Sequence, residues 1–418
     1  MKAKLRRVIG QPPVQGPRQG PVHTGRRPRR GGLARLALAL AIVSGANQAA
    51  AEGELRIGQS SVYSGPASSF STIPRLHAAY MKMVNDAGGV GGKKIVFLSL
   101  DDAFTPAKAI ENTRKLVEGE NVALMFAHFG SSQGLAARKY MNARKLPQLF
   151  VSSGAAAFGN YQEFPWTIGW QPTLVTEGKA VGSYIAGNLG GKKIGVLYEN
   201  AEFGRDYVKG LKEALGPAAG HIVRELTYES GDPTIDSQII TLKSAGAEII
   251  VNVSTPKYTA QAIRKIHALN WQPPHFIYSA SASIGAVIVP VGAEKAMGVM
   301  SATTYKDPND PKWKDDPGLK RWIAFMDRYF PEGDRREIYN VIAYLQAETL
   351  HKTLTQCNGD FSPENIMKQA THLDYQPDMM LPGIRVQTSP TNYYPVRKMG
   401  LTRFDGQRFA PFGELVGE

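Results

Sequence analysis

Apolar and polar residues after position 54 follow two alternating patterns. Short apolar runs of strand length occur at regular intervals, and between them apolar residues recur three and four positions apart. In the segment 73–87, Leu76, Ala79, Tyr80 and Met83 recur at this spacing, which predicts a helix with one buried face. The first part of the chain therefore alternates strands and helices. The predicted strands are 55–59, 94–100, 122–127 and 148–152, and the predicted helices are 73–87, 106–118 and 131–144.

The same alternation continues over residues 173–278. The helices predicted there are 173–189, 204–215, 234–244 and 257–269, and the strands are 193–198, 222–228, 248–253 and 275–278. This order is typical of a parallel sheet covered by helices on both faces. Two such sets in 418 residues predict an α/β protein with two doubly wound domains. Helices at 320–329 and 339–355 and strands near 298–303 and 396–404 follow without a low-complexity linker. We therefore expect short crossovers and a late return to the first domain.

The net charge of +13 is concentrated at the start of the chain. Residues 1–51 hold ten of the 49 Lys and Arg residues and no acid, which leaves 39 basic and 36 acidic residues in the remainder. The remainder is therefore close to neutral and lacks the basic excess of a nucleic-acid-binding domain. We expect no nucleic-acid partner.

The same N-terminal region has the order of an export signal. A basic stretch is followed by the apolar run 36–43 and by small residues that include Ala49 and Ala51, an A-x-A-like cleavage site. The run is much shorter than the roughly 20 residues of a membrane-spanning helix. The basic stretch is unusually long, so we expect the true start to lie further downstream. The single cysteine, Cys357, does not stand at the cleavage point, which argues against a lipid anchor. We predict a signal peptide at 1–51 and a soluble periplasmic monomer.

Motifs for cofactors and metals are missing or misplaced. The glycine cluster 88–92 follows a helix and opens a strand, whereas a dinucleotide fingerprint follows a strand and opens a helix. No P-loop, H-E-x-x-H or C-x-x-C pattern occurs, and no His, Cys or carboxylate cluster has metal-ligand spacing. The sequence predicts no cofactor and no metal site.

Two loops rich in Ser and Gly follow consecutive predicted strands. The first, 130–134, matches G-x-S-x-G, so Ser132 is a candidate hydrolase nucleophile if a later histidine completes a triad. Alternatively, the hydroxyls of Ser131 and Ser132 and the free N–H groups of the next helix bind a carboxylate. The second loop, 152–157, ends the next strand. The two loops converge on the crevice where open α/β sheets bind ligands.

Several short segments, taken in order, carry a resemblance to a known family. They are Ser64-Gly65-Pro66, Asn85–Lys93, Asp101-Asp102, Ser131-Ser132, Ser152–Ala155 and Glu202-Phe203-Gly204. Residues 54 to about 418 resemble the periplasmic leucine/isoleucine/valine-binding proteins, the type I solute-binding proteins of ABC importers. The resemblance implies two Rossmann-like lobes joined by three crossovers, with the ligand between them. Closure presents the protein to a permease in the inner membrane. Lobe 1 would comprise 52–171 plus about 304–380, and lobe 2 would comprise 172–303 plus about 381–418.

The resemblance also implies a set of ligand-binding residues. The serine that meets the ligand carboxylate matches Ser131, with Ser132 and Ser153 beside it. Backbone groups of the second loop match Gly154 and Ala155. The aromatic positions that face the ligand match Phe70 and Phe203, and Phe129, just before the serines, would be a further apolar wall.

Three family positions differ in this chain. The threonine that helps to hold an amino acid falls at Ala156, the acid that pairs with its ammonium falls within 279–283, and 254–256 lacks the family's tyrosine. A buried ammonium without a charged partner is costly. We therefore expect a carboxylate with an apolar or aromatic body rather than a typical α-amino acid.

Three acidic residues offer another way to bind an ammonium group, and two other functions remain open. Glu199, Asp101 or Asp102 could restore ammonium binding if one turned inward. We predict a binding protein and not an enzyme. The rival functions are a serine hydrolase that uses Ser132 and a sensory protein that reports to a receptor.

Overall fold

The computed structural model describes residues 53–417. The predicted signal at 1–51 lies outside these residues. No helix in the described range is long and apolar enough to cross a membrane. Within the same range, no three His, Cys, Asp or Glu side chains are grouped closely enough to hold a metal ion.

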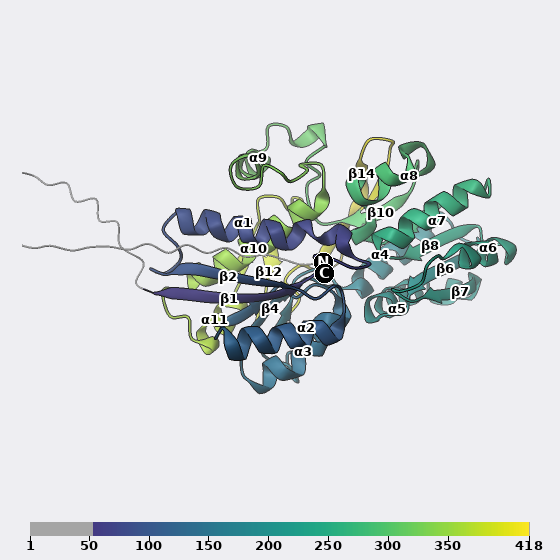
Figure 1. The fold of residues 1–418 in the computed structure, drawn as a ribbon. Helices are drawn as coiled ribbons and strands as arrows, with labels where there is room; N and C mark the ends of the chain where they lie inside the picture. The colour runs from purple at the N-terminus through teal and green to yellow at the C-terminus, as the bar shows by residue number, and fades with distance from the viewer. Residues whose placement is uncertain (1–52, 418) are drawn as a thin grey trace, which may run out of the picture. The chain divides into compact units, whose positions relative to one another are not determined.

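The first sheet has five parallel strands in the order β2-β1-β3-β4-β5. They are β1 (Glu54–Ser61), β2 (Lys94–Asp101), β3 (Leu124–Phe126), β4 (Gln148–Val151) and β5 (Thr167–Gly169). The helices α1 (Thr72–Asp86) and α10 (Ile338–Gln356) cover one face, and α2 (Pro106–Arg114) and α3 (Ser131–Ala143) cover the other (Figure 1). The doubly wound arrangement expected from the alternating pattern is confirmed. The three-residue strand β5 was not predicted.

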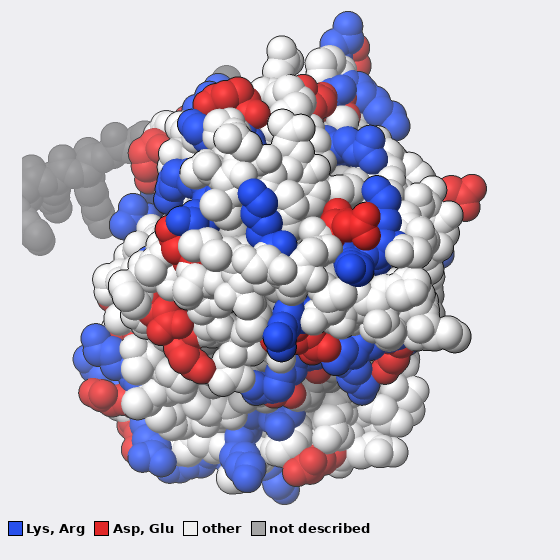
Figure 2. All heavy atoms as spheres, turned by 90° about the vertical axis from the view of Figure 1, so that its right-hand side faces the viewer, with Lys and Arg blue, Asp and Glu red and all other residues white. Residues whose placement is uncertain are grey.

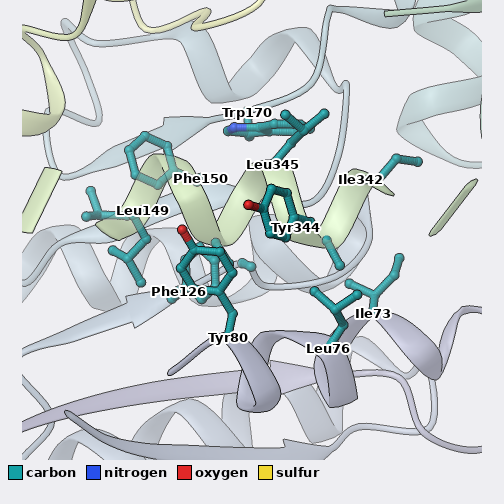
Figure 3. Packing of buried hydrophobic residues seen from close by; sticks show 14 of the residues in the cluster. Ile73, Leu76, Tyr80, Phe126, Leu149, Phe150, Trp170, Ile342, Tyr344 and Leu345 are labelled. Atoms are coloured by element: carbon teal, nitrogen blue, oxygen red, sulfur yellow. The ribbon is translucent and has the colours of Figure 1, made fainter. Parts of the chain in front are cut away.

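The core of this sheet joins segments far apart in the sequence. Tyr80 of α1 and Tyr344 of α10 meet edge to face, with ring centroids 5.4 Å apart. Both side chains lie in one cluster with the strand residues Phe126 and Phe150 (Figure 3). The helix α10 buries residues on most of its circumference, as a helix enclosed within a core does. It therefore fixes the position of Tyr339, in its first turn, against the first sheet.

The second sheet has seven strands in the order β14-β13-β10-β9-β8-β6-β7. Its parallel part consists of β6 (Ile194–Glu199), β7 (Ile222–Tyr228), β8 (Ile249–Val253), β9 (His275–Ile277) and β10 (Met300–Thr303). An antiparallel edge is added by β13 (Lys398–Phe404) and β14 (Phe409–Gly417). The helices of this half are α4 (Leu174–Asn188), α5 (Glu202–Leu215), α6 (Asp236–Ser244) and α7 (Pro256–Ala268).

Glycines allow α4 and α5 to pack closely. A Cβ at Gly178 would lie 2.1 Å from the carbonyl oxygen of Tyr207, and one at Gly210 would lie 2.1 Å from that of Val175. Only glycine allows the backbones to approach this closely. The contact brings Glu177 of α4 next to α5.

Smaller elements complete the described chain. They are α8 (Val289–Val291), α9 (Pro317–Tyr329), α11 (Pro363–Ala370), β11 (Asp374–Tyr375) and β12 (Val386–Gln387). On the face shown in Figure 2, Lys and Arg side chains are interspersed with Asp and Glu. This mixture agrees with the near balance of charge after residue 51.

Candidate functional site

The two Ser/Gly loops meet as the sequence predicted. An isolated parallel bridge joins Phe129 to Ser152, and the N–H of Gly130 donates to the carbonyl of Ser152 at 3.2 Å. Gly130 has a φ of 96°, and a Cβ there would lie 2.3 Å from the side-chain oxygen of Gln133. A glycine is therefore required at this turn. The turn sets Ser131 at the first position of α3, facing the second loop.

The hydroxyls of Ser131 and Ser153 form a buried pair. Their Oγ atoms are 2.7 Å apart, and each residue is only 6% exposed. The Oγ of Ser153 also accepts the N–H of Ala155 at 3.1 Å. Each hydroxyl carries one proton, and the bond between them uses one. The pair therefore keeps one proton for a further acceptor.

The start of α3 adds further donors. The first N–H groups of a helix have no partner within the helix. In the described chain, α3 has no side chain that caps these groups. Free amides and the positive end of the helix dipole favour an anion. With the spare serine proton, this end of the site is suited to a carboxylate.

Aromatic side chains from the loops and helices beside both sheets enclose the space in front of the serines. The hollow and the solvent at its mouth together hold about 530 Å³ of space free of protein atoms, and Ser131, Ser153 and the aromatics line it. On the first-sheet side, the Phe70 ring lies 4.8 Å from Phe129 and 4.7 Å from Tyr339 between centroids. On the second-sheet side, Phe203 stacks on Tyr278 at 5.5 Å. The body of a bound molecule would therefore contact mainly aromatic surface.

Three of the residues proposed from sequence lie outside this hollow. Ser132 is exposed, since the next helical position points about 100° away from Ser131. The carbonyl of Gly154 accepts the N–H of Leu174 at 2.8 Å. The Ala155 side chain packs against Val151 and Phe158, and its N–H is bonded to Ser153. The structure therefore brings together Ser131, Ser153, Phe70, Phe129 and Phe203, and does not bring these three to the hollow.

None of the three acids considered as ammonium partners lines the hollow. Asp101 accepts the N–H groups of Tyr63 and Ala103, each at 2.9 Å, and Asp102 accepts the Ser60 hydroxyl at 2.9 Å. Glu199 accepts the Tyr228 hydroxyl at 3.0 Å. Burial raises the pKa of Glu199 to about 7 and that of Asp102 to about 6.

Several lining residues were not anticipated from the sequence. Thr255 is the second residue after β8 and Tyr278 is the first after β9, so the rule that ligands bind at the carboxyl ends of parallel strands would have found them. Phe104 follows β2 in a loop with a φ of 60°. Tyr339 had no such signal, because α10 reaches the cleft only through tertiary packing.

A second hollow adjoins the first and contains an acid. Together with the solvent at its mouth it holds about 450 Å³ of space free of protein atoms, and it shares four lining residues with the first. These are Gln171, Tyr278, Ala280 and Ile342. Glu177 lines only this second hollow and is 3% exposed. Its two oxygens accept the N–H and the hydroxyl of Ser279, each at 2.7 Å. Burial raises its pKa to about 7.

Comparison with known proteins gives one family and many structural relatives. Residues 54–408 match the family model described as periplasmic binding protein. The Leu/Ile/Val-binding protein homolog 7 of Brucella abortus is 24% identical over 338 residues, which cover 78% of this chain and 82% of the relative. The leucine-, isoleucine-, valine-, threonine- and alanine-binding protein of Pseudomonas aeruginosa is 25% identical over 52% of this chain and 58% of its own.

Solved structures share the fold. A branched-chain amino acid ABC transporter protein of Thermus thermophilus with bound valine has a TM-score of 0.77 at 16% identity, covering 87% of this chain and 97% of its own. A solute-binding protein of an R. palustris ABC transporter in complex with benzoate has a TM-score of 0.75 at 18% identity, covering 88% and 98%. These likenesses show the type I periplasmic binding protein fold.

Proposed function

Because the chain belongs to the periplasmic binding protein family, we propose that it captures a small carboxylate between two lobes and delivers it to an inner-membrane ABC permease. The family consists of binding proteins, so the serine hydrolase considered from the G-x-S-x-G motif is wrong. The exposed position of Ser132, outside the cleft, agrees with this correction.

Each of the two proposed lobes contains one of the two sheets. Lobe 1 contains 52–171 and residues from about 304, and lobe 2 contains 172–303 and the C-terminal strands. The buried residues between Leu381 and Val396 pack with the first sheet, so we place the return to lobe 2 at β13 rather than near 381. Ligand binding favours the closed form through contacts to both lobes.

The hydroxyl pair of Ser131 and Ser153 at the uncapped start of α3 carries the proposal. One free hydroxyl proton and several free amides point to a carboxylate. Phe70, Phe129 and Phe203 enclose its body, and no acid lines the hollow beside the serines. We therefore favour a carboxylate with an apolar or aromatic body over an α-amino acid. Relatives with this fold have been solved with bound valine, benzoate or 3,4-dihydroxybenzoic acid.

A thermal-shift screen of the chain from residue 52 onward tests the proposal. Aromatic and aliphatic acids are compared with leucine and valine. A ligand at 100 times its dissociation constant adds about 2.7 kcal/mol of stability. Shifts with acids that lack an α-ammonium support the proposal, and shifts with leucine or valine alone contradict the ligand class. Ser132→Ala is the control and should leave every shift unchanged, whereas the double variant Ser131→Ala/Ser153→Ala should abolish the shifts.

The compartment follows from the same proposal. Membership of a periplasmic family agrees with an exported protein. We propose that the signal is cleaved near Ala51 and that the released protein is a monomer. N-terminal sequencing of the exported protein and its mass by light scattering test both statements. A retained basic N-terminus or a stable dimer would contradict them.

A further inference from the structure

The second hollow extends the cleft toward a buried acid. Ser131 and Ser153 line only the first hollow, and Glu177 lines only the second. Tyr278 and Gln171 line both and therefore stand between the two ends. The two hollows therefore adjoin through shared walls, with hydroxyl donors in the first and a carboxyl group in the second.

Glu177 has capacity for another hydrogen bond. An ionised carboxyl group accepts at about four positions. Ser279 occupies one position on each of its oxygens. No cation pairs with Glu177 within residues 53–417. A donor that enters the second hollow would therefore find an acceptor already held in place.

The surroundings of Glu177 favour such a donor. Tyr207 of α5 is fully buried, and its hydroxyl has no hydrogen-bond partner in the described part of the chain. Tyr207 packs against α4 beside Glu177, since a Cβ at the next residue, Gly178, would lie 2.1 Å from the Tyr207 carbonyl oxygen, and Tyr207 itself lines neither hollow. Buried polar groups are normally paired, so unused capacity around Glu177 points to a missing polar group.

We propose that the second hollow is a subsite for a hydrogen-bond donor at the far end of the ligand, accepted by Glu177. This inference rests on the proposed function and names its ligand class more closely. The ligand is a carboxylate whose apolar or aromatic body carries a distal hydroxyl or amino group. An α-ammonium does not meet this description, because it lies beside the carboxylate in the first hollow.

Paired probes test the subsite. Benzoate, phenylacetate and 3-phenylpropionate are each titrated against their para-hydroxy and para-amino analogues by calorimetry. At pH 8, where Glu177 is mostly ionised, and at the chain length that fits, the donor should strengthen binding about tenfold, the effect of one hydrogen bond to a charged group. The hydroxy and amino analogues distinguish the two kinds of donor. Glu177→Gln should remove most of this gain and leave the affinity for the parent acid within about threefold.

Two further variants separate the subsite from a general effect. Glu348→Gln alters another largely buried acid whose pKa is raised to about 8, and Glu348 lines neither hollow. It should retain the tenfold gain. Glu177→Asp keeps the negative charge but shortens the side chain, so it should also lose most of the gain; this variant tests the subsite even if Glu177→Gln unfolds, and a retained gain would refute it.

The outcomes keep the inference and the proposed function apart. If no carboxylate binds at all, the proposed function fails. If the parent acids bind and no para-substituent improves binding at any length, the subsite alone is refuted. A gain that survives Glu177→Gln also refutes it.

Discussion

Removing the two serine hydroxyls separately and together should give unequal losses of affinity. In the wild-type protein, one of the two hydroxyl protons joins the Oγ atoms of Ser131 and Ser153 at 2.7 Å, and the other is free for the ligand. In Ser131→Ala, the Ser153 hydroxyl loses its partner and donates its own proton to the ligand. Each single variant therefore keeps one donor, whereas the double variant keeps none.

The expected magnitudes follow from this count of protons. Each single substitution should cost about 1 kcal/mol, roughly fivefold in affinity, because only the positioning of the remaining donor is lost. The double substitution removes a hydrogen bond to a charged group and should cost about 3 kcal/mol, roughly 150-fold. The loss in the double variant would then exceed the sum of the single losses, as expected for two residues in contact.

Isothermal titration calorimetry with the acid that gives the largest thermal shift measures these values. Thermal unfolding without ligand serves as the control for folding. Ser153→Ala should itself lower stability slightly, because the N–H of Ala155 loses its acceptor. Additive losses would show that the hydroxyls act independently, and a double variant within threefold of wild type would refute the carboxylate site.

Three further predictions concern the turn, a buried acid and closure. Gly130→Ala should reduce ligand affinity more than tenfold and lower the melting temperature, because residue 130 has a φ of 96° and the new Cβ would meet the Gln133 side chain. Ligand affinity equal to that of the wild type would contradict this prediction. Burial raises the pKa of Glu177 to about 7, against 4.5 for the free side chain, so the folded state favours the protonated form. Its contribution to the free energy of unfolding is complete below pH 4.5 and falls by up to about 3 kcal/mol as the pH rises through 7. Denaturant melts should show that Glu177→Gln removes this fall, and an unchanged pH dependence would contradict the prediction. Asp206 of α5 accepts the N–H of Ala156, in the loop after β4, at 2.7 Å and so joins the two proposed lobes. Asp206→Ala should therefore weaken binding about threefold to tenfold, mainly through faster ligand release in stopped-flow measurements, and an unchanged release rate would refute a role in closure.

The strands and helices could be predicted because their patterns are local. The strand predicted at 222–228 has the bounds of β7, and the helix predicted at 131–144 ends one residue after α3. Apolar runs and helical spacing encode burial directly. The short strand β5 was missed because Ile168 is its only large apolar residue, and β14 was missed because most of its residues are not buried.

The site could be predicted only in part, for a related reason. Ser131 and Ser153 lie at the ends of consecutive strands, where topology alone brings loops together. Tyr339 and Glu177 lie at and near the starts of helices, and only the packing of α10 on α1 and of α4 on α5 brings them to the cleft. The sequence records which side chains are apolar, and it does not record which distant helix will face a given loop.

The most direct test of the central claim compares an acid with its own amide. The acid with the strongest thermal shift and the corresponding carboxamide have nearly the same shape, and only the acid presents two anionic oxygens to the Ser131–Ser153 pair. Calorimetry should show micromolar or tighter binding of the acid and at least hundredfold weaker binding of the amide, equivalent to about 2.7 kcal/mol. Equal affinity for the two would show that the serine end does not bind a carboxylate.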